Sequence, residues 1–108
     1  MWIRSAFWVG QPKPGEETAF DRAIQAELIP GLDRLPGVTS ARALWPRRRE
    51  DGPPDIHCQV IVEFADEAAL QTMLGSDERK ALRVRVGEVA AMFAGTISHI
   101  DYEVGAIA

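Results

Sequence analysis

The segment DIHCQVIVEF, residues 55–64, contains the strongest β-strand candidate in the chain, and the rest of the fold can be worked out from it. Its residues after Asp55 are mainly β-branched or aromatic, and the side chains of a strand alternate between two faces. One face would carry Ile56, Cys58, Val60, Val62 and Phe64, and the opposite face His57, Gln59, Ile61 and Glu63. We expect helices to cover the first, more apolar face.

Two further strands and a helix are predicted upstream of this segment. Residues 2–9 are rich in aromatic and β-branched types and end before a run of Gly and Pro, which is typical of a strand. Residues 16–35 predict an amphipathic helix, because apolar side chains recur every four residues, with Pro30 expected to break or kink it. Residues 39–46 predict a second strand, which a polar loop joins to residues 56–64 as a hairpin.

Two helices and a final strand are predicted downstream. Asp66 is a candidate N-cap for a helix over residues 67–74, and Ser76 for another over residues 77–93. Residues 96–104 alternate well enough for a last strand. The order β-α-β-β-α-β predicts a ferredoxin-like α+β sandwich in one domain, residues 1–108, with helices on one face of a four-stranded antiparallel sheet.

Composition excludes several classes of function. The 108 residues carry a net charge of −4, and their Lys and Arg are scattered apart from residues 47–49, so we expect no nucleic-acid partner. A single cysteine rules out an intramolecular disulfide, and no Cys/His spacing predicts a metal site. The single cysteine fits a cytoplasmic protein. No apolar run is long enough to span a membrane, so we expect no membrane partner. We also expect no cofactor.

Two helices can cover only one face of such a sheet, so the composition of the other face indicates what must cover it. In the first strand, alternation is expected to place Trp2, Arg4, Ala6 and Trp8 on this open face. In the last strand it is expected to place His99 there, together with Ile97, Asp101 and Glu103. Large aromatic groups mixed with ionisable ones predict a face buried against a second copy of the chain, around a partly polar cavity.

The chain also resembles the EthD-like branch of the dimeric α+β barrel superfamily over nearly its whole length. The likeness is carried by residues 19–38, AFDRAIQAELIPGLDRLPGV, and by residues 64–82, FADEAALQTMLGSDERKAL, on either side of a hairpin. The first helix of that family commonly runs Phe, then Trp, then His-x-Pro, then Leu-Pro-Gly-Val. The matching residues here are Phe20, Pro30, Leu35, Pro36, Gly37 and Val38. Ile24 stands where the Trp would be, and Leu28 where the His would be.

The resemblance implies a homodimer whose sheets pack into a barrel, with no cofactor. Relatives include cofactor-free monooxygenases, lactone isomerases, polyketide cyclases and proteins with no assigned chemistry, so the resemblance implies no single reaction. The replacement of the family-type histidine by Leu28 favours a protein without catalytic activity.

Residues His57 and Cys58 are neighbours and raise the possibility of a nucleophile and its base. Because adjacent residues of a regular strand point to opposite faces, they cannot form a hydrogen-bonded pair without a bulge. We expect Cys58 to be a buried apolar residue. His57 and His99 are the candidate catalytic bases, and Asp101 shares a face with His99, where a carboxylate can orient the imidazole.

The candidate ligand contacts are polar groups and one aromatic wall. They are Arg4, Trp8, Arg42, Gln59, Glu63 and Asp101. The arginines can hold a carboxylate or an enolate, and Trp8 can flank an aromatic or alicyclic ligand. Two function classes stay open: a cofactor-independent enzyme of proton transfer, isomerisation or oxygenation on a small organic substrate, and a non-catalytic accessory or ligand-binding dimer.

Overall fold

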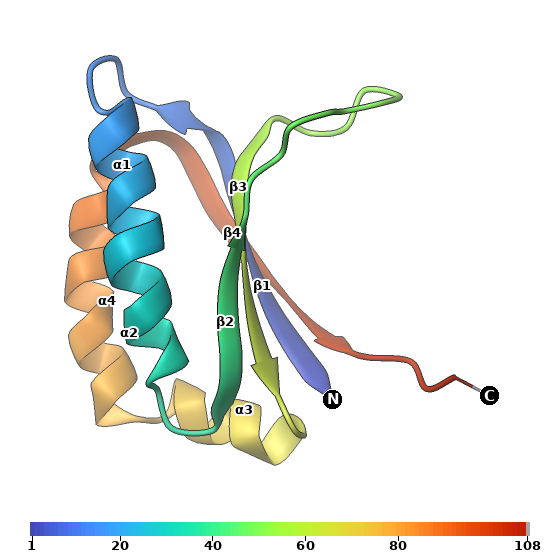
Figure 1. Ribbon diagram of the computed structural model, residues 1–108. Coiled ribbons are helices and arrows are strands. Elements are labelled where there is room, and N and C mark those ends of the chain that lie inside the picture. The colour runs from blue at the N-terminus through green and yellow to red at the C-terminus, as the bar shows by residue number, and fades with distance from the viewer. Residues whose placement is uncertain (108) are drawn as a thin grey trace.

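The strand that begins at Ile56 lies inside a four-stranded antiparallel sheet, with the helices on one face (Figure 1). The computed structural model describes residues 1–107. Its elements, in chain order, are β1 (Trp2–Pro12), α1 (Glu17–Ala23), the π-helical segment η1 (Ile24–Leu28), α2 (Ile29–Asp33), β2 (Val38–Leu44), β3 (Ile56–Phe64), α3 (Glu67–Leu74), α4 (Asp77–Ala90) and β4 (Phe93–Glu103). The strand order is β2-β3-β1-β4, as the ferredoxin-like prediction requires.

Local sequence signals set the ends of three of these elements as predicted. β3 has the predicted bounds. The Asp66 carboxylate accepts a hydrogen bond from the Ala69 amide at 2.8 Å and caps α3. The Ser76 hydroxyl accepts one from the Arg79 amide at 3.2 Å and caps α4. Each cap satisfies an amide that has no partner within its helix.

Pro30 does not end the first helical region. The helix continues from α1 into α2 through η1, where the Ile29 amide donates to the Ile24 carbonyl, five residues earlier. Pro30 has no amide hydrogen to complete an α-helical bond and lies in the first turn of α2, where that loss is tolerated. The wider π turn thus accommodates the proline without breaking the helix.

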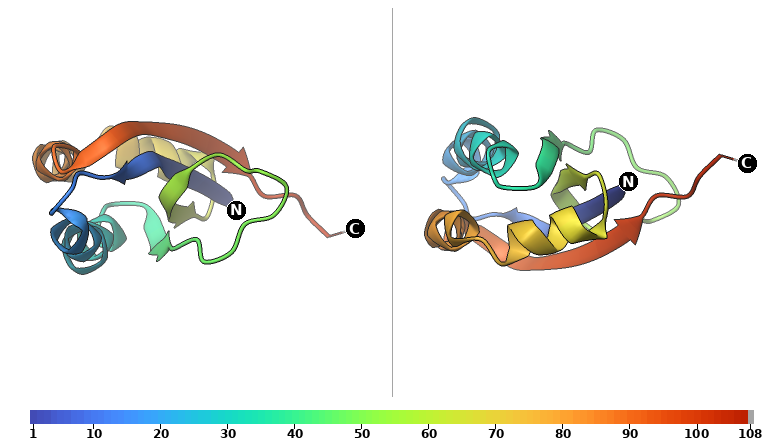
Figure 2. Two further views of the ribbon diagram at one scale, coloured as in Figure 1. Left: turned by 90° about the horizontal axis from the view of Figure 1, so that it is seen from above. Right: turned by 90° about the horizontal axis from the view of Figure 1, so that it is seen from below.

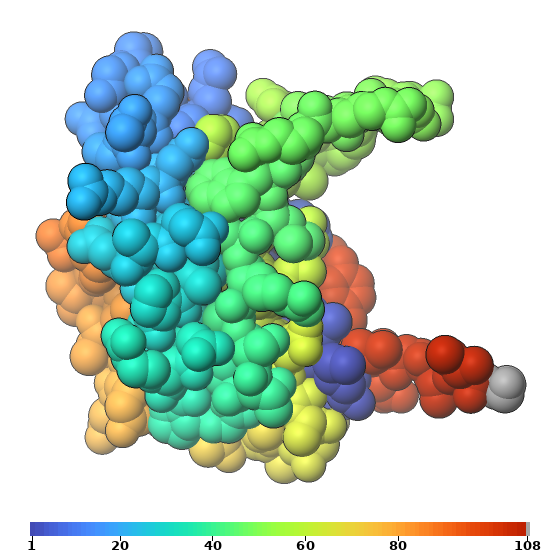
Figure 3. Space-filling view, in the orientation of Figure 1, coloured from blue at the N-terminus to red at the C-terminus, as the bar shows by residue number. Residues whose placement is uncertain are grey.

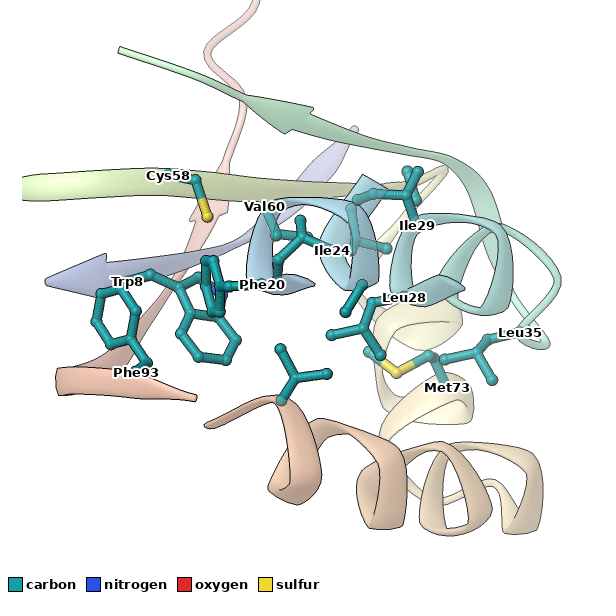
Figure 4. Packing of buried hydrophobic residues seen from close by; sticks show 14 of the residues in the cluster. Trp8, Phe20, Ile24, Leu28, Ile29, Leu35, Cys58, Val60, Met73 and Phe93 are labelled. Carbon is teal, nitrogen blue, oxygen red and sulfur yellow. The ribbon is translucent and has the colours of Figure 1, made fainter. Parts of the chain in front are cut away.

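The core lies between the helices and the sheet and is centred on an aromatic cluster (Figure 4). Trp8 has an exposed fraction of 3%, and its ring meets Phe20 and Phe93 edge to face at centroid distances of 5.1 and 5.3 Å. Phe93 begins β4, although its apolar spacing predicted it as the last residue of α4. Aromatic pairs of this kind stabilise a core beyond their buried area.

The burial of Trp8 corrects the expected faces of β1. Residues directly opposite in a sheet share a face, and Trp8 lies opposite Cys58 while Arg4 lies opposite Val62. Since Cys58 and Val62 face the helices, the set from Trp2 to Trp8 faces the helices too, and Ile3, Ser5 and Phe7 take the open face.

The expected faces of β4 were also reversed. His99 lies opposite Ala6, and Asp101 lies opposite Arg4, so both point toward the helices. Alternation alone could not decide these faces, because both sides of β1 and β4 carry large apolar groups. The correction places the ionisable groups of the two strands on the helix-covered side.

The open face carries several exposed apolar side chains among polar ones and is flanked by two projecting segments. Its more exposed apolar side chains are Leu44 at 44%, Ile100 at 47% and Tyr102 at 41%. Residues 45–55 and the C-terminal tail extend on the side away from the helices (Figure 2). In the space-filling view, the surface between the green loop and the red tail is hollowed (Figure 3).

Candidate functional site: an arginine-rimmed cavity between helices and sheet

The candidate site is a cavity of about 290 Å³ between the sheet and helices α2 and α4. Most of its wall is apolar, with polar groups contributed by β1, β4 and α4. The lining residues are Arg4, Ala6, Trp8, Leu28, Leu32, Val60, Val62, Met73, Arg79, Leu82, Arg83, Val86, Ile97 and His99. An apolar cavity with a few converging polar groups is the usual form of a small-molecule site.

Arg4, which lines the cavity from β1, forms an ion pair with Asp101 of β4. Arg4 Nη1 lies 2.9 Å from Asp101 Oδ1 and 3.1 Å from Oδ2, so one amino group donates to both oxygens. The side chains keep exposed fractions of 19% and 33%, respectively. The pair fixes the Arg4 guanidinium beside the cavity, and its other N–H groups stay able to donate to a ligand.

His99 is the next residue of β4 on the same face, two residues before Asp101 and opposite Ala6. Partial burial lowers the pKa of His99 below its ordinary value of 6.5, and Arg4, Arg79 and Arg83 lower it further, whereas Asp101 opposes the shift. The imidazole is therefore neutral at neutral pH and able to accept a proton. It is the one histidine that lines the cavity.

Arg79 and Arg83 come from the first turns of α4 and are spaced four residues apart, so they lie on one side of the helix. Arg79 Nη1 donates to the Leu74 carbonyl at 3.4 Å. Burial lowers the pKa of Arg79, and Arg83 and Arg4 lower it further by repulsion between like charges. These two arginines were not predicted as site residues; the available signal was their spacing beside the apolar stripe of Leu82 and Val86.

His57 lies away from the cavity, at a β-bulge. β1 advances from Trp8 to Val9 while β3 advances from Cys58 to Ile56, so His57 is the extra residue. The bulge turns His57 toward the helices instead of the expected open face, and its Nε2 lies 2.7 Å from Asp21 Oδ1. The structure therefore separates the two histidines into different surroundings.

Two aromatic side chains, Phe20 and Trp45, pack against the imidazole of His57. Its ring meets the ring of Phe20 at a centroid distance of 5.4 Å and that of Trp45 at 5.9 Å, both edge to face. The Trp45 indole donates to Gln25 Oε1 at 3.1 Å. These contacts join the start of the 45–55 loop to α1 and η1, and they give His57 a structural role.

Cys58 is fully buried in the core. Burial raises the pKa of its thiol to about 12, with a further contribution from the charge of Asp21. A thiol in such surroundings is not an activated nucleophile. The geometry supports the expectation that Cys58 is an apolar core residue.

Three of the expected ligand contacts lie on the open face, opposite the cavity. Arg42 is paired with Glu63 across β2 and β3. Gln59 Nε2 donates to the hydroxyl of the fully buried Ser5 at 2.7 Å. Of the residues expected to contact a ligand, only Arg4 and Trp8 therefore line the cavity with His99, and Asp101 is connected to it through its ion pair with Arg4.

Within residues 1–107, no three His, Cys, Asp or Glu side chains lie close enough together to hold a metal ion. None of the helices described there has the length and apolar character needed to cross a membrane.

Comparisons with known proteins identify the fold. No family model matches the chain, and no curated protein sequence does. An EthD family protein from Bacillus halodurans superposes with a TM-score of 0.77 at 18% identity, covering 97% of this chain and 99% of its own. A dimeric ferredoxin-like protein of unknown function from Jannaschia gives 0.68 at 21% identity, covering 96% and 100%. SnoaB from Streptomyces nogalater, a cofactor-independent oxygenase, gives 0.63 at 18% identity, covering 98% and 93%.

These likenesses extend over nearly the full length of each chain, at identities too low to carry a function across. They confirm the expected resemblance at the level of the fold. The chain has a ferredoxin-like fold, which it shares with these three proteins.

Proposed function

We propose that this protein binds a small organic molecule in the cavity between α4 and the sheet and moves a proton on it without a cofactor. The observation that carries the proposal is His99, a histidine of lowered pKa in an apolar cavity beside the guanidinium of Arg4. A neutral imidazole is a general base, and a guanidinium stabilises the negative charge that a deprotonated carbonyl compound develops.

The proposed step is the removal of a proton from a carbon next to a carbonyl group. The proton passes to a ring nitrogen of His99, the C–H electron pair moves toward the carbonyl, and Arg4 stabilises the resulting enolate oxygen. In a β,γ-unsaturated carbonyl compound the enolate is conjugated with the double bond, and return of the proton to the γ-carbon completes a double-bond isomerisation, which needs no oxidant, reductant or cofactor. Asp101 holds Arg4 in place through the ion pair.

The fold is shared with a protein described as a cofactor-independent oxygenase, which supports chemistry of this kind. In such a reaction the carbanion made by proton removal would transfer its electrons to dioxygen, the co-reactant, and form a C–O bond. Dioxygen consumption therefore distinguishes oxygenation from isomerisation in the experiment below.

A second candidate function is ligand binding without chemistry. The specific observation that favours it is Leu28, which lines the cavity where the EthD-like pattern carries a histidine. A protein of this kind would sequester its ligand and return it unchanged.

The working unit we propose is a homodimer joined through the open face of the sheet. That face carries the exposed side chains of Leu44, Ile100 and Tyr102. It also carries the hydrogen bond from Gln59 to Ser5. Apolar patches of this kind mark interfaces between proteins. A Jannaschia protein of the same fold is described as dimeric, which supports the assignment.

The test starts from small carbonyl compounds that raise the unfolding temperature of the protein. For each compound that binds, NMR in D₂O measures the exchange of carbon-bound hydrogen for deuterium. We expect His99→Gln to slow this exchange by about 10²-fold or more, the usual contribution of a general base. The rate should rise with pH and level off with a midpoint below 6.5, because the pKa of His99 is lowered and only its neutral form accepts a proton.

His57→Gln is the matched control, because His57 is the chain's other histidine and lies outside the cavity. It should leave the exchange rate within about twofold of the unsubstituted protein. Binding without exchange in the unsubstituted protein would favour the non-catalytic function. Loss of exchange in His57→Gln but not in His99→Gln would contradict the assignment of the base.

A further inference from the structure

We infer that the natural ligand of this cavity is an amphipathic organic anion, a carboxylate on a compact hydrocarbon body, whose charged group is bound by Arg79 and Arg83 of α4. The inference rests on the proposed function, because it assumes that the cavity is a ligand site. It adds the chemical class of the ligand and two residues that hold it.

The arginines are gathered on one part of an otherwise apolar wall. Three arginines, Arg4, Arg79 and Arg83, are among the residues that line the cavity, and no Asp or Glu lines it. The nearest carboxylate on the facing strand, Asp101, is paired with Arg4. Arg79 and Arg83 therefore add positive charge that this ion pair does not neutralise.

This local charge is opposite in sign to that of the whole chain, which is −4. By contrast, Arg85 on the same helix is paired: its Nη2 lies 2.6 Å from Glu27 Oε2 and its Nη1 lies 3.7 Å from Glu88 Oε2. Among the described residues no ion pair involves Arg79 or Arg83, and Arg79 is destabilised in its charged form by Arg83 and Arg4. A bound anion would relieve that repulsion, whereas a cationic ligand would increase it.

The apolar part of the wall indicates what kind of hydrocarbon body the ligand has. It offers only hydrocarbon and aromatic surface, from Leu82 and Val86 of α4, Leu28 of η1, Leu32 of α2 and Trp8 of β1. A volume of about 290 Å³ corresponds to on the order of ten water molecules at roughly 30 Å³ each. The ligand is therefore a small acid with an aromatic or alicyclic body, and its carboxylate is planar enough to accept two N–H groups from one guanidinium.

The experiment compares matched acids and amides by titration calorimetry. The probes are phenylacetate and cyclohexanecarboxylate, with phenylacetamide and cyclohexanecarboxamide as neutral partners of the same shape. We expect each acid to bind at least about tenfold more tightly than its amide, because hydrogen bonds to charged groups are roughly twice as strong as neutral ones. The preference should weaken as salt is added.

The double variant Arg79→Gln/Arg83→Gln should bind the acids at least about tenfold more weakly and the amides within about twofold of the unsubstituted protein. Lys80→Gln is the matched control. It removes one positive charge from the same helix, where the double variant removes two, but Lys80 does not line the cavity and pairs with Asp77. It should leave all four affinities within about twofold. Without ligand, the double variant should unfold at a temperature no lower than that of the unsubstituted protein, because the substitutions remove repulsion between like charges.

The outcomes separate the two proposals. Amides that bind as tightly as acids, or a double variant that keeps its affinity for acids, would overturn the anion inference and leave a neutral-ligand site. Failure of all four probes and of every carbonyl compound to bind would overturn the cavity as a ligand site, and the anion inference with it.

Discussion

Cys58 lies opposite Trp8 in the β1–β3 pairing and has no exposed surface. Its thiol pKa of about 12 and its burial act in the same direction, since the thiolate is the reactive form and the sulfur cannot be reached. We expect an aromatic disulfide reagent at about pH 8 to leave the folded protein unmodified and to react with one thiol per chain in denaturant. Modification of the folded protein at the rate of a free thiol would contradict the burial of Cys58.

The alternation of side chains along β3 predicts some of its residues correctly and others wrongly. Alternation correctly predicted Cys58 as a core residue, because the neighbours of Cys58 on the same face are apolar. It failed for His57, because one extra residue in β3 shifts the register beyond Trp8 and turns the imidazole toward Asp21. A bulge depends on how two strands pair, and nothing within residues 55–64 indicates it.

At the scale of elements, the pairing of β1 with β4 includes two glycines that lie opposite each other. Gly10 pairs with Gly95, and both have positive φ, at 126° and 155°. A Cβ on Gly95 would lie 2.0 Å from the Val9 carbonyl oxygen, far inside van der Waals contact. In this glycine pair, which we call the glycine crossing, Gly95 lies in β4 between Phe93 of the aromatic core and His99 of the cavity.

Gly95→Ala should therefore lower the free energy of unfolding by at least about 2 kcal/mol, through both the clash and the strained φ. Chemical denaturation measures the change. Gly87→Ala is the matched control, because Gly87 lies within α4 with open space around it and should gain about 0.5–1 kcal/mol from helix propensity. A Gly95→Ala protein as stable as the unsubstituted chain would show that the glycine crossing can relax.

The elements themselves were largely predictable, because their signals are local. The caps at Asp66 and Ser76 and the bounds of β3 follow from side chains within a few residues. The faces of β1 were not predictable, because both of its sides carry large apolar groups, and those of β4 were not, because both of its sides mix apolar and polar residues. Trp8 turns inward to pack edge to face against both Phe20 and Phe93, a tertiary contact that alternation along β1 does not reveal.

At the scale of the whole molecule, this ambiguity has a structural cause. A strand with two apolar sides suits a sheet covered by its own helices on one side and by a second chain on the other. The apolar residues on both sides of β1, which made its faces hard to assign from the sequence, therefore support the proposed dimer. The loop of residues 45–55 and the C-terminal tail project on either side of a hollow on this side of the molecule, where the proposed partner would dock (Figure 3).

Ile100 is the side chain with which to test that arrangement, because it is 47% exposed and lies opposite Ser5 near the middle of the open face. We expect light scattering at micromolar concentration to give the mass of a dimer for the unsubstituted protein. Ile100→Glu should raise the dissociation constant by at least about tenfold, since a charge placed in an apolar interface loses its hydration without gaining a partner. Val84→Glu provides the control, because Val84 is 70% exposed on α4, away from the open face, and should leave the dimer intact. A monomeric unsubstituted protein, or an Ile100→Glu variant as dimeric as the control, would mean that this face is not the interface and that its apolar side chains face solvent.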